Sequence, residues 1–302
     1  MQRVKKQVGL DREKINYDGS GIGIAVLDTG IGLHPDFDKR IYCFRDFVNH
    51  EKLPYDDSGH GTHVCGILCG SGRLSTFRYA GMAPGAGLVV GKVLNSEGDG
   101  ATEDMLQGMD WILQEKDKYN IRILNISVGI GNLNNSVKEE LLIKKMEEIN
   151  KAGIMIVCAA GNKGPGNNSI SSIGGNSGVI TVGCHDGGFY ADNQNRCELY
   201  SGRGDEHGRM IKPDLVAPGT NIISCDVKCK RTKNGYRNKY ISKSGTSMAT
   251  PIVSGAMALL IQKYPDFTNE TYRIRLLFSC TDLGIAWNRQ GWGMLNVERL
   301  LR

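Results

Sequence analysis

The chain has 302 residues, of which 40% are hydrophobic and 23% charged, and its formal net charge is +5 at pH 7. This composition is typical of a globular protein that can bury a large core without cross-links. No run of about 18 apolar residues is present, and basic residues are not interleaved with aromatic ones, so we expect neither a membrane nor a nucleic-acid partner. The sequence indicates no oligomeric state.

The N-terminal residues 1–18 are polar and charged. We expect them to form an arm or a short helix that leads into a single domain spanning residues 19–302. This arm lacks the apolar core of a signal peptide. The nine cysteines are odd in number and irregularly spaced, which indicates free thiols, including Cys225 and Cys229. Both observations favour the cytoplasm as the compartment.

Apolar and amphipathic stretches alternate through much of the chain. Strands are predicted at residues 21–27, 88–94, 121–128, 154–160 and 179–184. Helices are predicted after His60, after Ser247, and over residues 104–119, 137–152 and 268–278. Residues 31–55 and 185–243 look irregular, apart from extended pieces at 213–219 and 222–224. The alternation predicts an α/β fold with a mostly parallel central sheet and helices on both faces.

A carboxylate ends the first predicted strand, in the segment Val26-Leu-Asp-Thr-Gly30. Ligand sites of open α/β sheets gather at the carboxyl ends of strands, so Asp28 is a candidate functional residue. The alternative is that Asp28 only begins a turn, which the following Thr-Gly pair would also suit.

A histidine flanked by glycines occurs in the segment Ser58-Gly-His-Gly-Thr-His-Val64, which leads into the predicted helix after His60. The glycines beside His60 remove side-chain bulk, which lets the ring lie close to another segment of the chain. The spacing of His60 and His63 would also suit a zinc pair, but only Asp56 and Asp57 are nearby as further ligands. We therefore favour a structural, hydrogen-bonded role for His63.

The segment Lys243-Ser-Gly-Thr-Ser-Met-Ala-Thr-Pro251 leads into apolar positions at helical spacing. Ser247 is therefore expected at or near a helix N-terminus, where free N–H groups and the helix dipole favour negative charge. That environment suits a nucleophile whose attack creates an oxyanion. By itself, however, the segment favours the simpler interpretation, in which a Ser or Thr caps the helix.

The three segments together occur in the order Asp, His, Ser, and from about Gly19 to Leu301 the sequence resembles the subtilisin-like serine proteases (subtilases, peptidase family S8). In character it is closest to the intracellular subtilisins. The resemblance implies a subtilisin-like three-layer fold and a serine endopeptidase that hydrolyses polypeptides through an acyl-enzyme intermediate. This chemistry requires no cofactor.

The resemblance also implies a role for each matching residue. Ser247 would attack the scissile carbonyl, His60 would transfer the proton, and Asp28 would hold the imidazole. Asn162, in Ala159-Ala-Gly-Asn162, matches the amide of the family's oxyanion hole, although a turn Asn would also follow a glycine.

Three segments match substrate-binding parts of the family. The walls of the main specificity pocket correspond to Ser127-Val128-Gly129 and Ala159-Ala160-Gly161, and their small residues leave room for a large apolar side chain. The loop Gly98-Asp99-Gly100 resembles the lining of the outer subsites. This region is acidic because it contains Glu97, Asp99, Glu103 and Asp104. Either it favours basic substrate residues upstream of the cut, or it is only a solvated acidic loop.

Metal binding is where the sequence departs from many members of the family. Secreted subtilases often bind calcium in a loop shortly after the helix of the catalytic histidine, but residues 70–79 contain no Asp, Glu or Asn. Asp36 is a possible oxygen ligand for a structural calcium elsewhere. The sequence therefore assigns no metal ligand.

Several alternatives stay open beside a general endopeptidase. One is a dedicated protease that removes the leader of a single peptide, and a remote one is an inactive subtilase-like binding module. Residues 1–18 could block the cleft before activation. Cys65 and Cys69 are predicted to be buried packing residues, with thiol sensitivity of the nearby His60 as the alternative.

Overall fold

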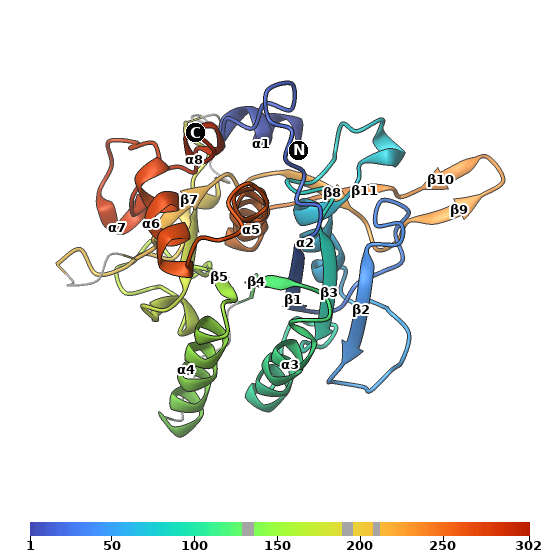
Figure 1. Cartoon of the computed structure of the whole chain (residues 1–302), viewed down its shortest axis with the longest axis horizontal. Helices are drawn as coiled ribbons and strands as arrows, with labels where there is room; N and C mark the ends of the chain where they lie inside the picture. Colours follow the sequence, from blue (N-terminus) through green and yellow to red (C-terminus); the bar gives the residue numbers. More distant parts are fainter. Residues whose placement is uncertain (129–135, 189–195, 208–211) are drawn as a thin grey trace.

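A seven-stranded parallel sheet forms the centre of the computed structural model, which describes residues 1–128, 136–188, 196–207 and 212–302 (Figure 1). The strand order is β2-β3-β1-β4-β5-β6-β7, and every neighbouring pair is parallel. The strands are β1 (Gly23–Asp28), β2 (Ile41–Asp46), β3 (Gly87–Lys92), β4 (Ile121–Ile126), β5 (Met155–Ala159), β6 (Ile180–Cys184) and β7 (Leu215–Ala217). This confirms the predicted α/β fold.

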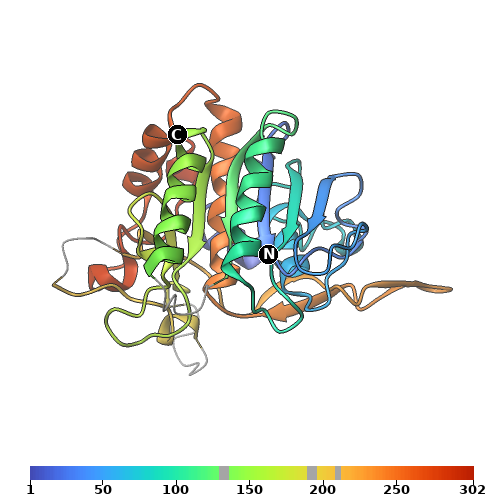
Figure 2. The ribbon, with the colours of Figure 1, turned by 90° about the horizontal axis from the view of Figure 1, so that it is seen from below.

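Helices cover both faces of the sheet, as Figure 2 shows from the side of α3 and α4. One face packs against α2 (His60–Cys69) and α5 (Thr246–Lys263), and the other packs against α3 (Thr102–Glu115) and α4 (Ser136–Lys151). Successive residues of β1 alternate between the two cores: Ile24 and Val26 join the first, Ala25 and Leu27 the second. A strand buried on both faces must be apolar throughout, which is why this segment reads as a continuous apolar run.

The predicted irregular regions contain strands that the sequence analysis missed. Residues 31–55 include the edge strand β2, whose side chains are mostly half-exposed. Residues 185–243 include β11 (Tyr240–Lys243) and the projecting pair β9 (Lys230–Thr232) and β10 (Gly235–Arg237) (Figure 1). β11 pairs with β8 (Ile222–Cys225), which matches the extended piece predicted at 222–224. The missed strands β2, β9, β10 and β11 face solvent on much of their surface, so they show no apolar alternation.

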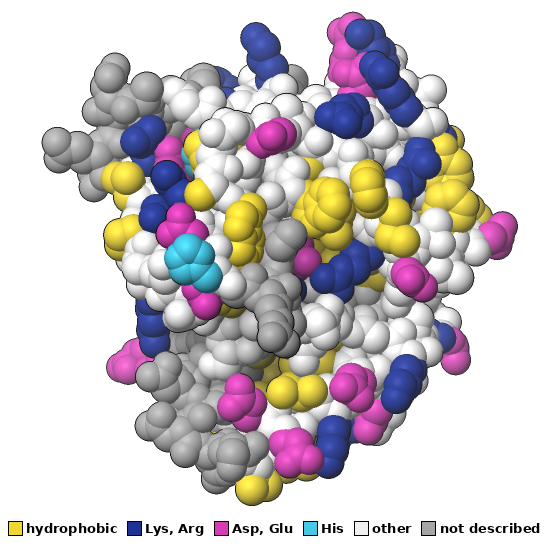
Figure 3. All heavy atoms as spheres, turned by 90° about the vertical axis from the view of Figure 1, so that its left-hand side faces the viewer, with side chains coloured by type: hydrophobic (Ala, Val, Ile, Leu, Met, Phe, Trp, Pro, Cys, Tyr) yellow, Lys and Arg dark blue, Asp and Glu magenta, His cyan; other side chains and the backbone are white. Residues whose placement is uncertain are grey.

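The remaining helices lie near the C-terminus: α6 (Asn269–Ser279), α7 (Trp287–Gln290) and α8 (Val297–Leu300). Single 3₁₀ turns occur at Arg73–Ser75, Ile173–Gly175 and Cys197–Leu199. The surface on this side mixes acidic and basic side chains with small apolar groups (Figure 3). Near the C-terminus, the exposed rings of Phe278 and Trp292 pack at a tilt, with 5.0 Å between ring centroids.

The N-terminal arm begins with the short helix α1 (Gln2–Gln7), as predicted. Val4 and Val8 are buried in the same core as α2 and α5, and the Val297 N–H donates to the Val8 carbonyl. In the part of the chain that the structure describes, no hydrogen bond or ion pair joins this arm to Asp28, His60 or Ser247. The arm therefore packs as part of the domain, and the idea that it blocks the cleft gains no support from these contacts.

The cysteines differ from the prediction at one place. Cys184 and Cys197 form a disulfide between the end of β6 and the 3₁₀ turn that follows, whereas the sequence analysis expected free thiols. The other seven cysteines are free, including Cys225 and Cys229. The cytoplasmic compartment stays a prediction. No helix in the described ranges is both long and apolar enough to cross a membrane.

Candidate active site

Three neighbouring strands end at one edge of the sheet, and candidate residues follow each of them. Asp28 ends β1, Ser127 follows β4, and Asn162 follows β5. The register aligns Val26 of β1 with Asn125 of β4, and Ile126 of β4 with Cys158 of β5. Because all three strands are parallel, the sheet gathers these residues at its carboxyl edge, where α/β proteins place their ligand sites.

Asp28 and His60 form the central contact of this edge. His60 is the first residue of α2, and its Nδ1 lies 2.7 Å from Asp28 Oδ1, which also accepts the Thr29 N–H. Gly61 makes this approach possible, because a Cβ there would lie 2.1 Å from the Gly30 carbonyl oxygen. The bond fixes the proton on Nδ1 and leaves Nε2 of the neutral ring as an acceptor.

Opposing effects set the pKa of His60. Burial lowers it, but the Asp28 carboxylate raises it by more, so the pKa of His60 lies above its ordinary value. The Lys243 ammonium lowers the pKa and the more distant Asp56 carboxylate raises it. A base with this environment is neutral at alkaline pH and gains a stabilised charge when it takes a proton.

Asp56 holds the start of α2 in place, a role that the sequence analysis missed. Its Oδ1 accepts from Thr29 Oγ1 at 2.8 Å and from the Gly59 N–H at 2.7 Å, and its Oδ2 accepts from the Thr62 N–H and hydroxyl at 2.8 and 2.6 Å. Burial raises the pKa of Asp56, but these hydrogen bonds lower it by more. Asp56 thus joins the end of β1 to the helix of His60. Its place four residues before the histidine was a signal, but the residue was considered only as a metal ligand.

Ser247 lies in the first turn of α5, as predicted. Gly245 precedes the helix with φ +146°, a conformation that strongly favours glycine, and its N–H donates to the Gly219 carbonyl at 3.0 Å. Thr246 donates from its N–H and its hydroxyl to Asn162 Oδ1, at 3.1 and 3.0 Å. The Asn162 amide therefore lies against the start of α5: a Cβ at Gly245 would lie 3.3 Å from Asn162 Nδ2 and 3.8 Å from Ser247 N.

The start of α5 is tied to α2 through β8 and β11. His63 Nε2 lies 3.0 Å from the Ile222 carbonyl oxygen and 3.2 Å from that of Ile241, on these two strands. β11 then leads through Lys243 to Ser247. Among the described residues the Ser247 hydroxyl makes no hydrogen bond to His60. In enzymes without substrate such bonds are often long and tighten only in the complex.

His63 is structural, as predicted. Burial and the Lys243 ammonium lower the pKa of His63 to about 3, so its ring is neutral at physiological pH. Its Nε2 is engaged by carbonyl oxygens, while His60 Nδ1 faces Asp28. Among the described residues, neither His60 nor His63 belongs to a group of three ligand atoms close enough together to hold a metal ion.

The two segments that the resemblance assigns to pocket walls follow β4 and β5 at the same edge of the sheet. Ala159 and Ala160 are buried, and Gly161 has φ +93°, which its lack of a side chain permits. Ser127 is buried and accepts from Asn125, which in turn accepts from Ser254 of α5. Val128 is half-buried, whereas Gly129 lies outside the described residues.

The acidic loop is organised by Asn95, another residue that the sequence analysis did not single out. The Asn95 side chain accepts from the N–H groups of Glu97 and Asp99, and its own N–H donates to the Asp99 carbonyl. Gly98 has φ +87°, and a Cβ at Gly100 would lie 2.4 Å from the Val93 carbonyl oxygen, so both positions need glycine.

The structure also shows which charges of this loop are free. Glu103 is paired with Lys138 at 2.7 Å. Glu97, Asp99 and Asp104 have no ion-pair partner among the described residues.

Asp36, the possible calcium ligand, is engaged by protein groups. Asp36 Oδ1 accepts the Leu74 N–H at 3.0 Å and Oδ2 accepts the Tyr240 hydroxyl at 2.7 Å, so both carboxylate oxygens are engaged. Neighbouring His34 and Cys225 would complete a cluster of three, but His34 Nδ1 accepts the Asp36 N–H and Nε2 faces the Lys239 carbonyl. Protein groups thus already contact both oxygens of Asp36 and both nitrogens of His34, and a structural calcium stays a prediction.

Cys65 and Cys69 are fully buried in the core between α2 and α5, as predicted. Burial raises the pKa of Cys65 well above its ordinary value and that of Cys69 to about 12. Both thiols are therefore protonated and inaccessible, which supports the packing role over thiol sensitivity.

Comparison with known proteins identifies several relatives of this chain. The model of the subtilase family matches residues 19–293. The chain is 39% identical to serine protease AprX of Bacillus subtilis (strain 168), over 93% of this chain and 66% of that protein, and thus spans about two thirds of the relative's length. It is 34% identical to Subtilisin Savinase of Lederbergia lenta, over 94% and 92% of the two chains. Among solved structures, a cold-adapted subtilisin-like serine proteinase superposes with a TM-score of 0.72 at 26% identity, covering 94% of this chain and 91% of the other.

Proposed function

The chain belongs to the subtilase family of serine proteases, and from that premise we propose that it is an endopeptidase whose triad is Asp28, His60 and Ser247. The observation that carries the proposal is the 2.7 Å contact between Asp28 and His60, placed beside a helix that begins at Thr246. Asp28 holds the imidazole with its proton on Nδ1, and His60 Nε2 takes the proton of the Ser247 hydroxyl. The hydroxyl oxygen then attacks the carbonyl carbon of the scissile peptide bond.

In this proposal two hydrogen-bond donors stabilise the developing oxyanion. Asn162 Nδ2 and the Ser247 N–H supply two hydrogen bonds, and the dipole of α5 adds positive potential at its N-terminus. Since Asn162 Oδ1 is anchored on Thr246, the amide needs little reorganisation during the reaction. His60 next gives its proton to the leaving amine, and water hydrolyses the acyl-enzyme by the same steps in reverse.

A fluorophosphonate probe tests the nucleophile directly. We expect the probe to label the purified chain, and the label to be lost in Ser247→Ala but kept in Ser177→Ala, which removes an exposed hydroxyl elsewhere. Labelling that survives in Ser247→Ala would contradict the assignment. A folded protein that takes no label at all would favour the inactive binding module.

The oxyanion donor has its own test. Replacing Asn162 with Ala should lower kcat by about 10²–10³-fold, the size known for the corresponding amide in subtilisin and not one derived from this structure. KM should change little, because the hydrogen bond forms mainly in the transition state. A loss confined to KM would assign Asn162 to substrate binding instead.

The substrate is proposed to be an unfolded polypeptide bound along the sheet edge. The small walls at Ala159–Gly161 leave room for a large apolar side chain before the cut, and backbone near Ser127 can pair with an extended substrate. A broad digest of denatured casein would support a general endopeptidase. Cleavage of a single site in a cellular extract would support the dedicated processing protease.

A further inference from the structure

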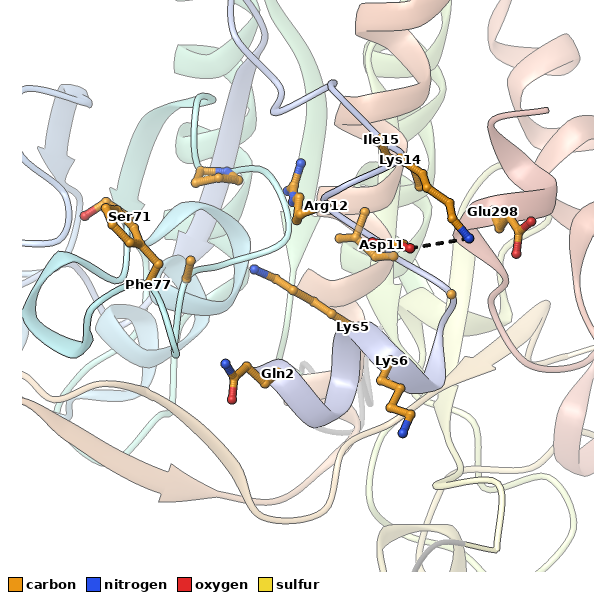
Figure 4. A pocket seen from close by; sticks show the side chains of 14 residues that line it. Gln2, Lys5, Lys6, Asp11, Arg12, Lys14, Ile15, Ser71, Phe77 and Glu298 are labelled. Atoms are coloured by element: carbon orange, nitrogen blue, oxygen red, sulfur yellow. Dashed lines mark ion pairs between the residues drawn. The ribbon is translucent and has the colours of Figure 1, made fainter.

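A cavity lies beside the N-terminal arm, and none of the residues that line it belongs to the candidate active site. It has a volume of about 780 Å³ and opens between the arm and the loop that follows α2 (Figure 4). This volume lies within the range of sites that hold small organic ligands. The wall has an apolar part formed by Leu10, Ile15, Phe77, Ala80 and Pro84.

The charged part of the wall has an excess of cations. It includes Lys5, Lys6, Arg12 and Lys14, opposed by Asp11 and Glu298. Each of these acids already has a partner: Asp11 pairs with Lys14 at 3.6 Å, and Glu298 pairs with Arg302 at 2.8 Å. In the described parts of the chain, Lys5 has no hydrogen-bond or ion-pair partner for its ammonium group.

Lys5 is placed to meet a ligand. Its side chain extends from α1 across the cavity toward the loop of Ser71 and Phe77, whereas Lys6 points away (Figure 4). Burial and the positive charge of Arg12 lower the pKa of Lys5 to about 8. An anion in the cavity would relieve this mutual repulsion.

Phe77 places an apolar ring opposite the cations of the cavity, in a backbone conformation that is energetically unfavourable. Its side chain is 69% exposed, and both Thr76 and Phe77 have positive φ, +51° and +64°. Such a backbone is unfavourable for a bulky residue and is kept only where the surrounding structure imposes it. The Phe77 N–H donates to the Gly72 carbonyl and the Ala80 N–H donates to the Phe77 carbonyl, which holds the ring at the mouth of the cavity.

We propose that this cavity binds an amphipathic carboxylate of medium chain length, with its anionic head at Lys5 and Arg12 and its apolar chain against Leu10, Ile15 and Phe77. The guanidinium of Arg12 is held in place by the Tyr17 and Met82 carbonyls, so its charge is fixed at the wall. Charge complementarity selects the head group, and the exposed ring and its apolar neighbours select the chain.

Calorimetric titration of the full chain with decanoate tests the proposal. We expect saturable binding at one site, at least about tenfold weaker in Lys5→Met, which keeps the stem but removes the charge. Lys233→Met, in the distant turn between β9 and β10, is the matched control and should bind as the unaltered chain does. Decanol, which lacks the charge, and acetate, which lacks the chain, should each bind at least tenfold more weakly than decanoate.

Thermal melting and fluorophosphonate labelling show that each variant is folded. If Lys5→Met fails to fold, Phe77→Ser removes the exposed ring instead and should also weaken binding. Absence of saturable decanoate binding would overturn the proposal. Equal affinity for decanoate and decanol, or decanoate binding unchanged in both variants, would overturn it as well.

Discussion

Two groups of carboxylates lie near the carboxyl edge of the sheet, and they differ in almost every physical respect. Asp28 and Asp56 are buried and accept hydrogen bonds from fixed donors at the start of α2. Glu97 and Asp99 lie in an exposed loop, where Asn95 holds their backbone but nothing described pairs with their charges. The carboxylates of Asp28 and Asp56 are thus fixed parts of the structure, whereas those of Glu97 and Asp99 are charges that solvent screens.

The difference shows what burial does to a carboxylate. A buried charge is stable only with several donors around it, so each donor's position becomes fixed in turn. An exposed charge keeps its water and acts on a ligand only through a potential that salt weakens within about 10 Å. We therefore expect large effects on rate and stability from the buried group, and small effects on specificity from the exposed one.

The largest effect should come from Asp28→Asn. The amide would present an NH₂ group or a weaker acceptor to His60 Nδ1, and the ring would take the tautomer in which Nε2 carries the proton. We expect kcat to fall by about 10⁴-fold, the size known for this substitution in a triad of the same type. Steady-state kinetics on a peptide anilide would measure it. A loss below tenfold, in a protein that melts normally, would mean that Asp28 does not orient His60.

Asp56→Asn should mainly reduce stability. The Asn side chain has one acceptor oxygen where the carboxylate receives donors from Thr29, Gly59 and Thr62 on two, so buried donors lose their partner. We expect a loss of about 3 kcal/mol in the free energy of unfolding. Denaturant unfolding would measure it, with Asp38→Asn as control, since that residue forms only a surface pair with Arg73.

The stabilisation by Asp56 should also depend on pH in a direction that follows from its pKa. Because the folded-state pKa of Asp56 lies below 3.8, its contribution is present above about pH 4 and is lost as the pH falls through the folded-state pKa. Below pH 4 the free energy of unfolding of the unaltered chain should therefore fall more steeply with decreasing pH than that of Asp56→Asn. Parallel curves for the two proteins would show that Asp56 is not held as an ionised group.

A smaller effect is expected from Lys243, whose single positive charge changes the pKa of His60. His60 must be neutral to act as a base, so kcat/KM rises as the pH increases through its pKa. The Lys243 ammonium lowers that pKa, while Asp28 and Asp56 raise it. Lys243→Met should therefore move the acid limb to higher pH and leave the alkaline plateau unchanged. The shift should shrink in high salt, and Lys233→Met should show none.

The sequence predicted the parts of this site that local pattern controls. Asp28 ends an apolar run, His60 is flanked by glycines, and Ser247 begins a helix, so each could be placed from its neighbours alone. The order of the three segments then identified the family, from which the role of Asn162 followed. Gly61 fits the same logic, because its missing Cβ is what allows β1 and α2 to meet.

Other features depend on contacts between distant segments and could not be read locally. The pairing of Cys184 with Cys197 depends on the path of the intervening chain, and odd cysteine counts pointed to free thiols. The strands β2, β9 and β10 are largely exposed and lack an apolar period. Phe77 joins a cavity wall only because the N-terminal arm folds back against the loop after α2.

The smallest effect should come from the exposed carboxylates, through the double variant Glu97→Gln and Asp99→Asn. Both charges are unpaired in the described structure, whereas Glu103 is already paired with Lys138. A substrate lysine upstream of the cut would gain no more than a surface ion pair, worth about 0.2–1 kcal/mol. Peptide-library profiling should therefore show the preference for Lys over Gln falling by less than about fivefold in the variant. High salt should abolish the preference in the unaltered chain, and Asp117→Asn, at the far end of α3, should leave it intact. If the unaltered chain shows no such preference at low salt, the loop is only a solvated surface, and the buried carboxylates alone shape the site.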